Sequence, residues 1–281
     1  MLCNGRAAMS IWRCPICQEP LHREEHTWIC SNRHSFDQAR SGYVNLLPVN
    51  QKRTKQPGDN KQMVHARTQF LDAGYYSVLR EAVAQCVTAH AADHGVLLDV
   101  GCGEGYYLQG VTEALQQAGK RLPAYGIDIA KCAVDAAAKR CKEASFAVAS
   151  VFHLPVQDHC CTMVLSMFAP YCGSEIERVL ASGGTLIQVI PGAQHLWELK
   201  QAIYDTPYRN TVKDYALEGF SLLQVDRITK RILLSNPQDI QNLFTMTPYY
   251  YKTGVQEHEK LQALQELETE ISFELIQYRK H

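Results

Sequence analysis

The chain has 281 residues, of which 46% are hydrophobic and 20% are charged, enough to bury a core in one large or two modest domains. Its 28 Lys and Arg residues balance 29 Asp and Glu residues, so a nucleic-acid partner would have to bind a local basic patch. The absence of a ~20-residue apolar run and of a signal-peptide pattern predicts a cytoplasmic protein without a membrane partner.

Residues 12–47 form the first predicted domain, which is rich in Cys and His. It has too little apolar sequence to fold without a stabilising cross-link such as a metal ion. Four expected ligands fall in two close pairs separated by twelve residues: Cys14, Cys17, Cys30 and His34. This spacing predicts a closed, tetrahedral, structural Zn²⁺ site with no position left open for a substrate. His22 and His26 lie between the pairs without a paired spacing, so we interpret them as solvated loop residues.

A polar, basic segment with two prolines and a glycine, residues 48–62, is predicted to be a linker. The remaining domain, residues 63–281, begins with a helical pattern over 64–90 that is interrupted near Gly74. Strands and helices then alternate: strands at 96–100, 124–128, 146–149, 161–167 and 185–190, and helices at 106–118, 131–142 and 195–204. This alternation predicts an α/β fold whose parallel sheet has helices on both faces. The tail predicts strands at 227–234 and 266–279 and a helix near 238–244.

The first of these strands runs into a glycine-rich turn and then into a helix, which is typical of a nucleotide-binding loop. Glycine at Gly101 and Gly103 allows a sharp turn and lets a ligand approach the backbone closely. Asp128 ends the next strand, where an acidic side chain holds ribose hydroxyls; its alternative role is the N-cap of the following helix. The spacing G-x-G-x-G departs from G-x-G-x-x-G, which disfavours a dehydrogenase.

The glycine loop and Asp128 resemble the cofactor motifs of class I, Rossmann-like methyltransferases that use S-adenosylmethionine, and Gly183-Gly184 is similar to the turn before their fifth strand. With the cysteine pairs in front, the chain from about Trp12 onward resembles the bacterial large-subunit (23S) rRNA guanine-N1 methyltransferases of the RlmA type. The resemblance is strong to about Leu199 and is carried by these stretches: His34–Asp37, Gly42–Leu47, Pro57–Asp59, Arg67–Tyr76, Leu98–Tyr107, Phe168–Pro170 and Pro191–Leu199.

This resemblance implies methyl transfer from S-adenosylmethionine to N1 of a guanine in a hairpin loop of large-subunit rRNA, carried out by a homodimer. Four residues that match the family pattern are implied to line the cofactor pocket: Tyr76, Gly103, Glu104 and His195. Because the family pattern begins shortly before Cys14, we expect residues 1–11 to be an extension and Met9 to be an alternative start.

The substrate base is expected to be flipped out of its stack to reach the pocket. Amino-group methyltransferases often carry Asn/Asp-Pro-Pro-Tyr after the fourth strand, but this chain has Phe168-Ala-Pro-Tyr171 there. We therefore hypothesise that Phe168 or Tyr171 stacks on the base, and we assign no general base. Six basic residues are expected to grip the RNA: Arg23, Arg33, Arg40, Lys52, Arg53 and Lys55. The alternatives are a methyltransferase of a small molecule and a non-catalytic RNA-binding module with a vestigial cofactor pocket.

Overall fold

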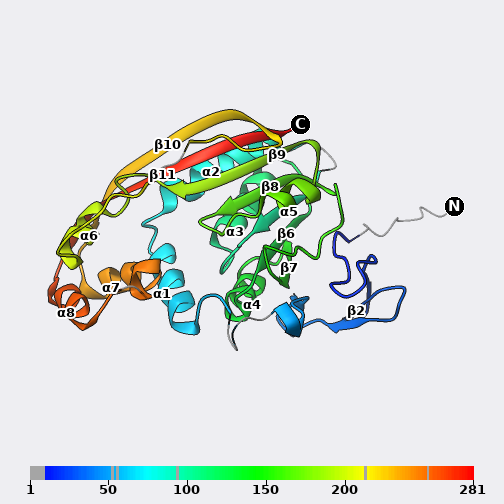
Figure 1. Ribbon diagram of the computed structural model, residues 1–281, viewed down its shortest axis with the longest axis horizontal. Coiled ribbons are helices and arrows are strands. Elements are labelled where there is room, and N and C mark those ends of the chain that lie inside the picture. The colour runs from blue at the N-terminus through cyan, green and yellow to red at the C-terminus, as the bar shows by residue number, and fades with distance from the viewer. Residues whose placement is uncertain (1–9, 52–53, 55–56, 93–94, 212–213, 252) are drawn as a thin grey trace.

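An eight-stranded sheet flanked by helices forms the larger part of the protein, and a three-stranded sheet precedes it (Figure 1). The structure is a computed structural model that describes residues 10–51, 54, 57–92, 95–211, 214–251 and 253–281. Three of the expected RNA-binding residues, Lys52, Arg53 and Lys55, lie outside this range. No helix in the described ranges is long and apolar enough to cross a membrane.

The centre of the large sheet is parallel, as the alternating pattern predicts. Its five strands are β5 (Leu97–Val100), β6 (Ala124–Asp128), β7 (Ala144–Val148), β8 (Cys161–Met167) and β9 (Leu180–Pro191). They lie in the order β7-β6-β5-β8-β9, so the chain leaves β5 on one side and returns on the other with β8. The carboxyl ends of β5 and β8 therefore flank the topological switch point, where open α/β sheets bind their ligands.

Two long strands extend the sheet beyond β9. Strand β10 (Phe220–Leu234) pairs antiparallel with β11 (Leu267–Lys280), which in turn pairs antiparallel with β9. At the opposite edge, β4 (Val44–Asn45) pairs parallel with β7, and Val44 lies opposite Ala147. The last part of the predicted zinc-binding segment is thus built into the large sheet.

Helices cover both faces of the sheet, because neighbouring strand residues such as Leu97 and Leu98 point into different hydrophobic cores. The helices have these bounds: α1 (Lys61–Asp72), α2 (Ser77–His90), α3 (Tyr106–Gln117), α4 (Lys131–Arg140), α5 (Gly173–Val179), α6 (Trp197–Ile203), α7 (Pro237–Thr245) and α8 (Val255–Ala263), with short 3₁₀ turns at Val49–Gln51 and Pro248–Tyr251. The predicted interruption near Gly74 separates α1 from α2; Gly74 has a left-handed φ of 84°. Helices α5 and α8 are additions to the elements predicted from sequence.

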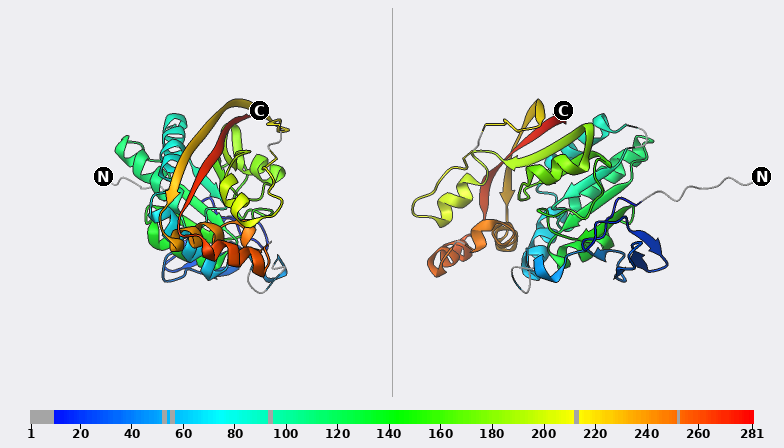
Figure 2. Two further views of the ribbon diagram at one scale, coloured as in Figure 1. Left: turned by 90° about the vertical axis from the view of Figure 1, so that its left-hand side faces the viewer. Right: turned by 45° about the vertical axis from the view of Figure 1, so that its right-hand side comes forward.

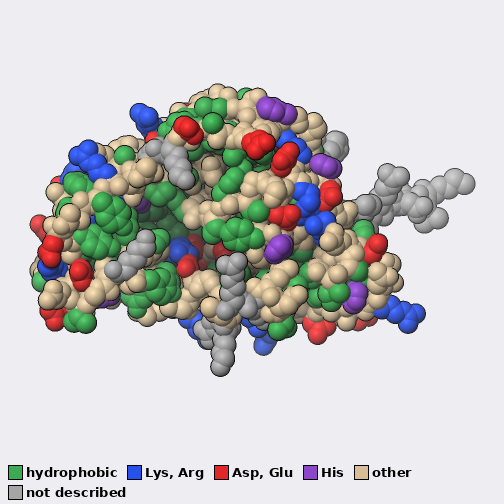
Figure 3. Space-filling model, in the orientation of Figure 1, with side chains coloured by type: hydrophobic (Ala, Val, Ile, Leu, Met, Phe, Trp, Pro, Cys, Tyr) green, Lys and Arg blue, Asp and Glu red, His purple; other side chains and the backbone are tan. Residues whose placement is uncertain are grey.

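Helices α6, α7 and α8 gather at one end of the β10–β11 ribbon, whereas the N-terminal segment lies at the other side of the molecule (Figures 1 and 2). Helix α1 packs against α7 and so joins this lobe to the sheet. Figure 3 shows the face between the lobe and the sheet hollowed, with acidic and basic side chains at the bottom of the hollow. The carboxyl ends of the parallel strands lead toward this region.

The small sheet consists of β1 (His22–Glu24), β2 (Thr27–Ile29) and β3 (Ser35–Asp37), paired antiparallel in chain order. The residues just before it anchor it to the larger domain. Trp12 is fully buried, and its ring meets the edge of Tyr125 on β6 with ring centroids 5.3 Å apart. The backbone N–H of Arg13 donates to the carbonyl of Pro155 at 2.9 Å. Buried aromatic area thus compensates for the small core of this segment.

Candidate cofactor pocket and metal centre

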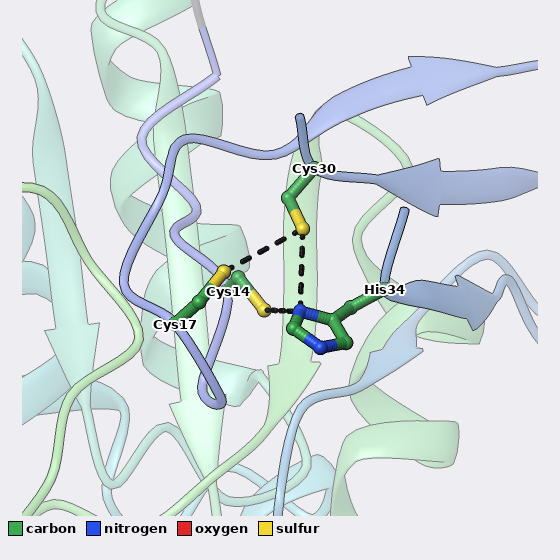
Figure 4. A group of neighbouring side chains, drawn as sticks. All are labelled: Cys14, Cys17, Cys30 and His34. Carbon is green, nitrogen blue, oxygen red and sulfur yellow. Dashed lines mark hydrogen bonds between the residues drawn. The ribbon is translucent and has the colours of Figure 1, made fainter. Parts of the chain in front are cut away.

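The four expected zinc ligands meet in space, and all of their ligand atoms lie within 4.8 Å of one another (Figure 4). Nδ1 of His34 is 3.5 Å from Sγ of Cys14 and 3.5 Å from Sγ of Cys30, and Sγ of Cys17 is 3.6 Å from Sγ of Cys30. A tetrahedral Zn²⁺ with ordinary bond lengths requires S···S separations of about 3.8 Å and S···N separations of about 3.6 Å. The donor set therefore fits one zinc ion.

Two tight turns present these ligands. In the first, the N–H of Gln18 donates to the carbonyl of Cys14 at 2.8 Å; in the second, the N–H of Arg33 donates to the carbonyl of Cys30 at 2.8 Å. Gln18, directly after Cys17, and Arg33, directly before His34, both adopt a left-handed φ, which reverses the chain at each turn. His22 and His26 are both exposed, as expected, and His26 lies in a turn; His22, however, is the first residue of strand β1 rather than a loop residue. All four ligand positions come from protein, so this centre leaves no open position for chemistry.

The glycine loop has the close packing that its sequence requires. Gly101 has a φ of 83°, and a Cβ at this position would come within 2.4 Å of the Cβ of Ala169. Gly103 has a φ of 55°, and a Cβ there would enter space in which only Arg67 lies within 4 Å. The loop therefore packs tightly against the turn after β8 and leaves its other side open to a ligand.

Asp128 holds the glycine loop from the end of β6. Its Oδ2 accepts the N–H of Gly103 at 3.0 Å, and its Oδ1 accepts the N–H of Ala130 at 2.8 Å. Burial raises the pKa of Asp128, and these two N–H groups oppose that shift. Because each carboxylate oxygen has two lone pairs, both retain capacity for a ligand hydroxyl. The N-cap of α4 is Ala130, so Asp128 is not the helix cap; its side chain joins the glycine loop to the turn before α4.

Tyr76 and His195 are 119 positions apart in the sequence but are neighbours in the structure. The N–H of Ser272 donates to Nδ1 of His195 at 3.2 Å, and Nε2 of His195 lies 3.3 Å from the hydroxyl of Tyr76. Burial, together with Lys200, lowers the pKa of His195 to about 3, so the ring is neutral at physiological pH. Since Nδ1 accepts, Nε2 carries the proton and donates to Tyr76. The hydroxyl hydrogen of Tyr76 is left to donate to a ligand.

Five buried side-chain polar atoms have no hydrogen-bond partner among the described residues, and two of them border the glycine loop. These are Oδ1 of Asp99, at the end of β5, and the hydroxyl of Tyr107, in the first turn of α3. Burial raises the pKa of Asp99 to about 8. Buried polar atoms are seldom left unpaired in folded proteins, so this pocket is suited to a polar ligand. Asp99 and Tyr107 were not among the predicted site residues, although both lie within the motif around the glycine loop.

Glu104 is buried directly after Gly103, and Arg67 of α1 lies beside it. Burial raises the pKa of Glu104, whereas the charge of Arg67 opposes that rise. Nη2 of Arg67 makes an ion pair with Oδ2 of Asp59 at 2.6 Å. Asp59 and Arg67 lie in two of the stretches that carry the family resemblance, but no role was predicted for either residue.

Phe168 and Tyr171, the two candidates for stacking on a substrate base, lie in different environments. Phe168 is 42% exposed and has a left-handed φ of 53°, a strained conformation for an aromatic residue. Its ring is near those of Phe273 and Tyr107, with centroids 5.7 Å and 6.5 Å away. The hydroxyl of Tyr171 is buried, and its ring packs over Gly173. Phe168 therefore presents the better stacking surface.

Comparison with known proteins agrees with both parts of the site. Residues 12–55 match the zinc-ribbon family model described as RlmA, N-terminal, and residues 91–263 match the model described as methyltransferase domain. A 23S rRNA (guanine(748)-N(1))-methyltransferase of Streptomyces fradiae is 41% identical over 68% of this chain and 67% of its own length. The YxjB protein of Bacillus subtilis (strain 168), provisionally named a 23S rRNA (guanine-N(1)-)-methyltransferase, is 34% identical over 75% of this chain and 76% of its own length.

The chain belongs to the 23S rRNA guanine-N1 methyltransferase family. It is a class I methyltransferase with an N-terminal zinc ribbon, as the sequence motifs predict. Its cofactor is S-adenosylmethionine, and its metal is a structural zinc ion.

Proposed function

We propose that the protein transfers the methyl group of S-adenosylmethionine to N1 of a guanine in a hairpin loop of large-subunit rRNA. The observation that carries the proposal is the pairing of an RlmA-type zinc ribbon with a methyltransferase domain in one chain, which is 34–41% identical to relatives named for this reaction. A cytoplasmic location follows from an rRNA substrate. We also propose a homodimer, on the family resemblance.

We propose that the cofactor lies over the glycine loop at the switch point between β5 and β8. Gly101 and Gly103 supply close backbone approach, Asp128 accepts ribose hydroxyls, and Glu104 faces the cationic methionine end. Tyr76 donates its remaining hydrogen to the cofactor, oriented by His195. Arg67 and Arg140 only partly offset the negative charge of the buried carboxylates, so the pocket favours a cofactor with net positive charge.

Bound S-adenosylmethionine supplies an activated methyl group, so the protein needs chiefly to align the acceptor and exclude water. We propose that Phe168 stacks on the flipped guanine beside Tyr107 and Phe273. Guanine N1 carries a proton that must leave during the transfer, and we assign no side chain to accept it.

We propose that the zinc ribbon contacts the RNA hairpin. Arg23, Arg33 and Arg40 are all exposed on it. Nε of Arg23 donates to the carbonyl of Glu25 at 2.9 Å, a contact that leaves its terminal nitrogens available to phosphate oxygens. Because these contacts read backbone phosphates, RNA affinity should fall steeply as salt rises.

The deciding experiment is incubation of the protein and S-adenosylmethionine with rRNA from a strain that lacks the enzyme. Mass spectrometry should find one new methyl group, and primer extension should stop at a guanine in a hairpin loop, because N1 methylation blocks base pairing. Matched rRNA from the wild-type strain should accept no further methyl group. Methylation of free guanosine or another metabolite with no methylation of RNA would refute the proposal in favour of a small-molecule enzyme.

A further inference from the structure

Arg67 reaches from α1 to the open side of the glycine loop. A Cβ built on Gly103 would lie 3.8 Å from Nη1 of Arg67 and, apart from the adjoining residues of the loop, would meet no other atom of the described residues within 4 Å. The guanidinium therefore borders the space into which a ligand must move to contact the backbone of the loop. Helix α1, which carries this arginine, packs against α7 of the lobe on one side and α4 on the other (Figure 1).

Only one end of this guanidinium is engaged. Nη2 contacts Oδ2 of Asp59 at 2.6 Å and donates to the carbonyl of Met246 at 3.2 Å. Within the described ranges, Nη1 has no protein acceptor in hydrogen-bond geometry. The free Nη1 can donate its N–H groups to an anionic oxygen, so this arginine is suited to a carboxylate or phosphate ligand.

The charges around Arg67 narrow the class of ligand. Burial would lower the pKa of Arg67, but Asp59 and Glu104 raise it above its ordinary value, and Asp128 adds to their effect. Arg67 thus lies among three acidic side chains, and Arg140 is a second basic residue that acts on Glu104. A phosphate dianion would be repelled by this excess of negative charge, whereas a zwitterion with one carboxylate and one ammonium group meets a charge of opposite sign at each end.

We propose that Arg67 binds the carboxylate of the methionine end of S-adenosylmethionine, with Glu104 facing its ammonium group and Asp59 positioning the arginine. This inference rests on the proposed function and deepens it, because it explains how the site distinguishes the cofactor from analogues that lack the carboxylate. Asp59 is a positioning residue that acts through Arg67.

The local backbone shows why Asp59 can hold this place. The preceding residue, Gly58, has a left-handed φ of 78°, and a Cβ there would come 2.8 Å from Cγ2 of Ile129 and 2.9 Å from the Cβ of Ala130. The segment therefore packs closely on the turn that follows Asp128, which only glycine permits at this point. The carbonyl of Asp59 also accepts the thiol of Cys132 at 3.3 Å. The ribose side and the methionine side of the pocket are thus linked through one tight contact.

Calorimetric titration of the full-length, zinc-loaded protein with two ligands tests the inference. S-adenosylmethionine carries the carboxylate, and decarboxylated S-adenosylmethionine keeps the sulfonium and amine without it. Wild-type protein should bind the complete cofactor more tightly. In Arg67→Gln, the Kd for S-adenosylmethionine should rise about tenfold or more, equivalent to about 1.4 kcal/mol. The Kd for the decarboxylated compound should stay unchanged or fall, because a repelling cation is removed. Arg67→Lys should keep part of the preference.

Arg178→Gln is the matched control. Arg178 is also an ion-paired arginine of similar exposure, 2.8 Å from Glu175, but it lies on α5 and its other contacts are to residues 154–158 rather than to the glycine loop. This variant should bind both ligands as the wild type does. Asp59→Asn should lose part of the preference. Equal weakening of both ligands in Arg67→Gln, or no change in either, would overturn the inference while leaving the proposed function intact. If wild-type protein bound neither ligand, the proposed function would fail and the inference with it.

Discussion

Replacing Asp128 with Asn separates two roles that this carboxylate combines, the shape of the empty loop and the binding of ribose. In the free protein, both of its oxygens accept a backbone N–H, from Gly103 at 3.0 Å and from Ala130 at 2.8 Å. An Asn side chain has one acceptor oxygen and one NH₂ group, so it can satisfy only one of these donors. The loop would lose a contact even when no cofactor is present.

The expected size of this effect follows from two opposing contributions. Leaving one buried N–H without an acceptor costs about 1–3 kcal/mol. Burial raises the pKa of Asp128, so the buried charge itself costs free energy, and its removal in Asn offsets part of the loss. We expect a net loss of about 1 kcal/mol in the free energy of unfolding. In a protein of this size that corresponds to a decrease of about 2–4 °C in Tm.

Scanning calorimetry of the cofactor-free protein measures how far Asp128 stabilises the empty loop. Titration with S-adenosylhomocysteine measures its part in ribose binding, and we expect the Kd of Asp128→Asn to be about tenfold or more higher. Asp72→Asn is the control, since Asp72 pairs with Arg140 at 2.7 Å but is half exposed, where ion pairs contribute about 0–1 kcal/mol. An unchanged Tm for cofactor-free Asp128→Asn would refute the loop-holding role. An unchanged Kd as well would remove Asp128 from the cofactor site.

Three further predictions concern the metal, the buried acid and the substrate base. Cys17→Ser should abolish the one equivalent of zinc measured by mass spectrometry and should lower Tm. The Kd for S-adenosylhomocysteine should stay within about twofold, because the metal centre takes no part in the pocket. Retention of stoichiometric zinc would contradict the ligand assignment. Burial raises the pKa of Asp99 to about 8 from an ordinary value of 3.8, so the folded cofactor-free protein holds a proton that the unfolded chain releases, and stability falls as pH rises across this window. Asp99→Asn should flatten that decline in urea unfolding at pH 5, 6.5 and 8, and an identical slope for both proteins would disprove the assignment. Phe168→Ala should lower turnover on rRNA about tenfold or more with unchanged cofactor affinity, whereas normal turnover would eliminate stacking by Phe168.

Most of the secondary structure could be predicted from local patterns. The five parallel strands and the helices between them were expected close to where they occur, because apolar runs and helical periodicity involve residues within about one element. Helix α5 was missed because it has only seven residues. Helix α8 was missed because it buries only Leu261, which leaves almost no apolar periodicity to detect.

Three motifs could be identified without the structure: the paired zinc ligands, the glycine loop and the acid at the end of β6. Each motif depends on spacing within a turn or between adjacent elements. Which distant side chains lie beside these motifs could be seen only in the folded protein. Tyr76 and His195 meet across 119 positions, and Trp12 reaches Tyr125. Sheet order and helix packing bring such residues together, and no local periodicity encodes them. The free end of Arg67 beside Gly103 is one such result of packing. In our proposal it places a positive charge for the cofactor carboxylate next to Glu104, which faces the ammonium group.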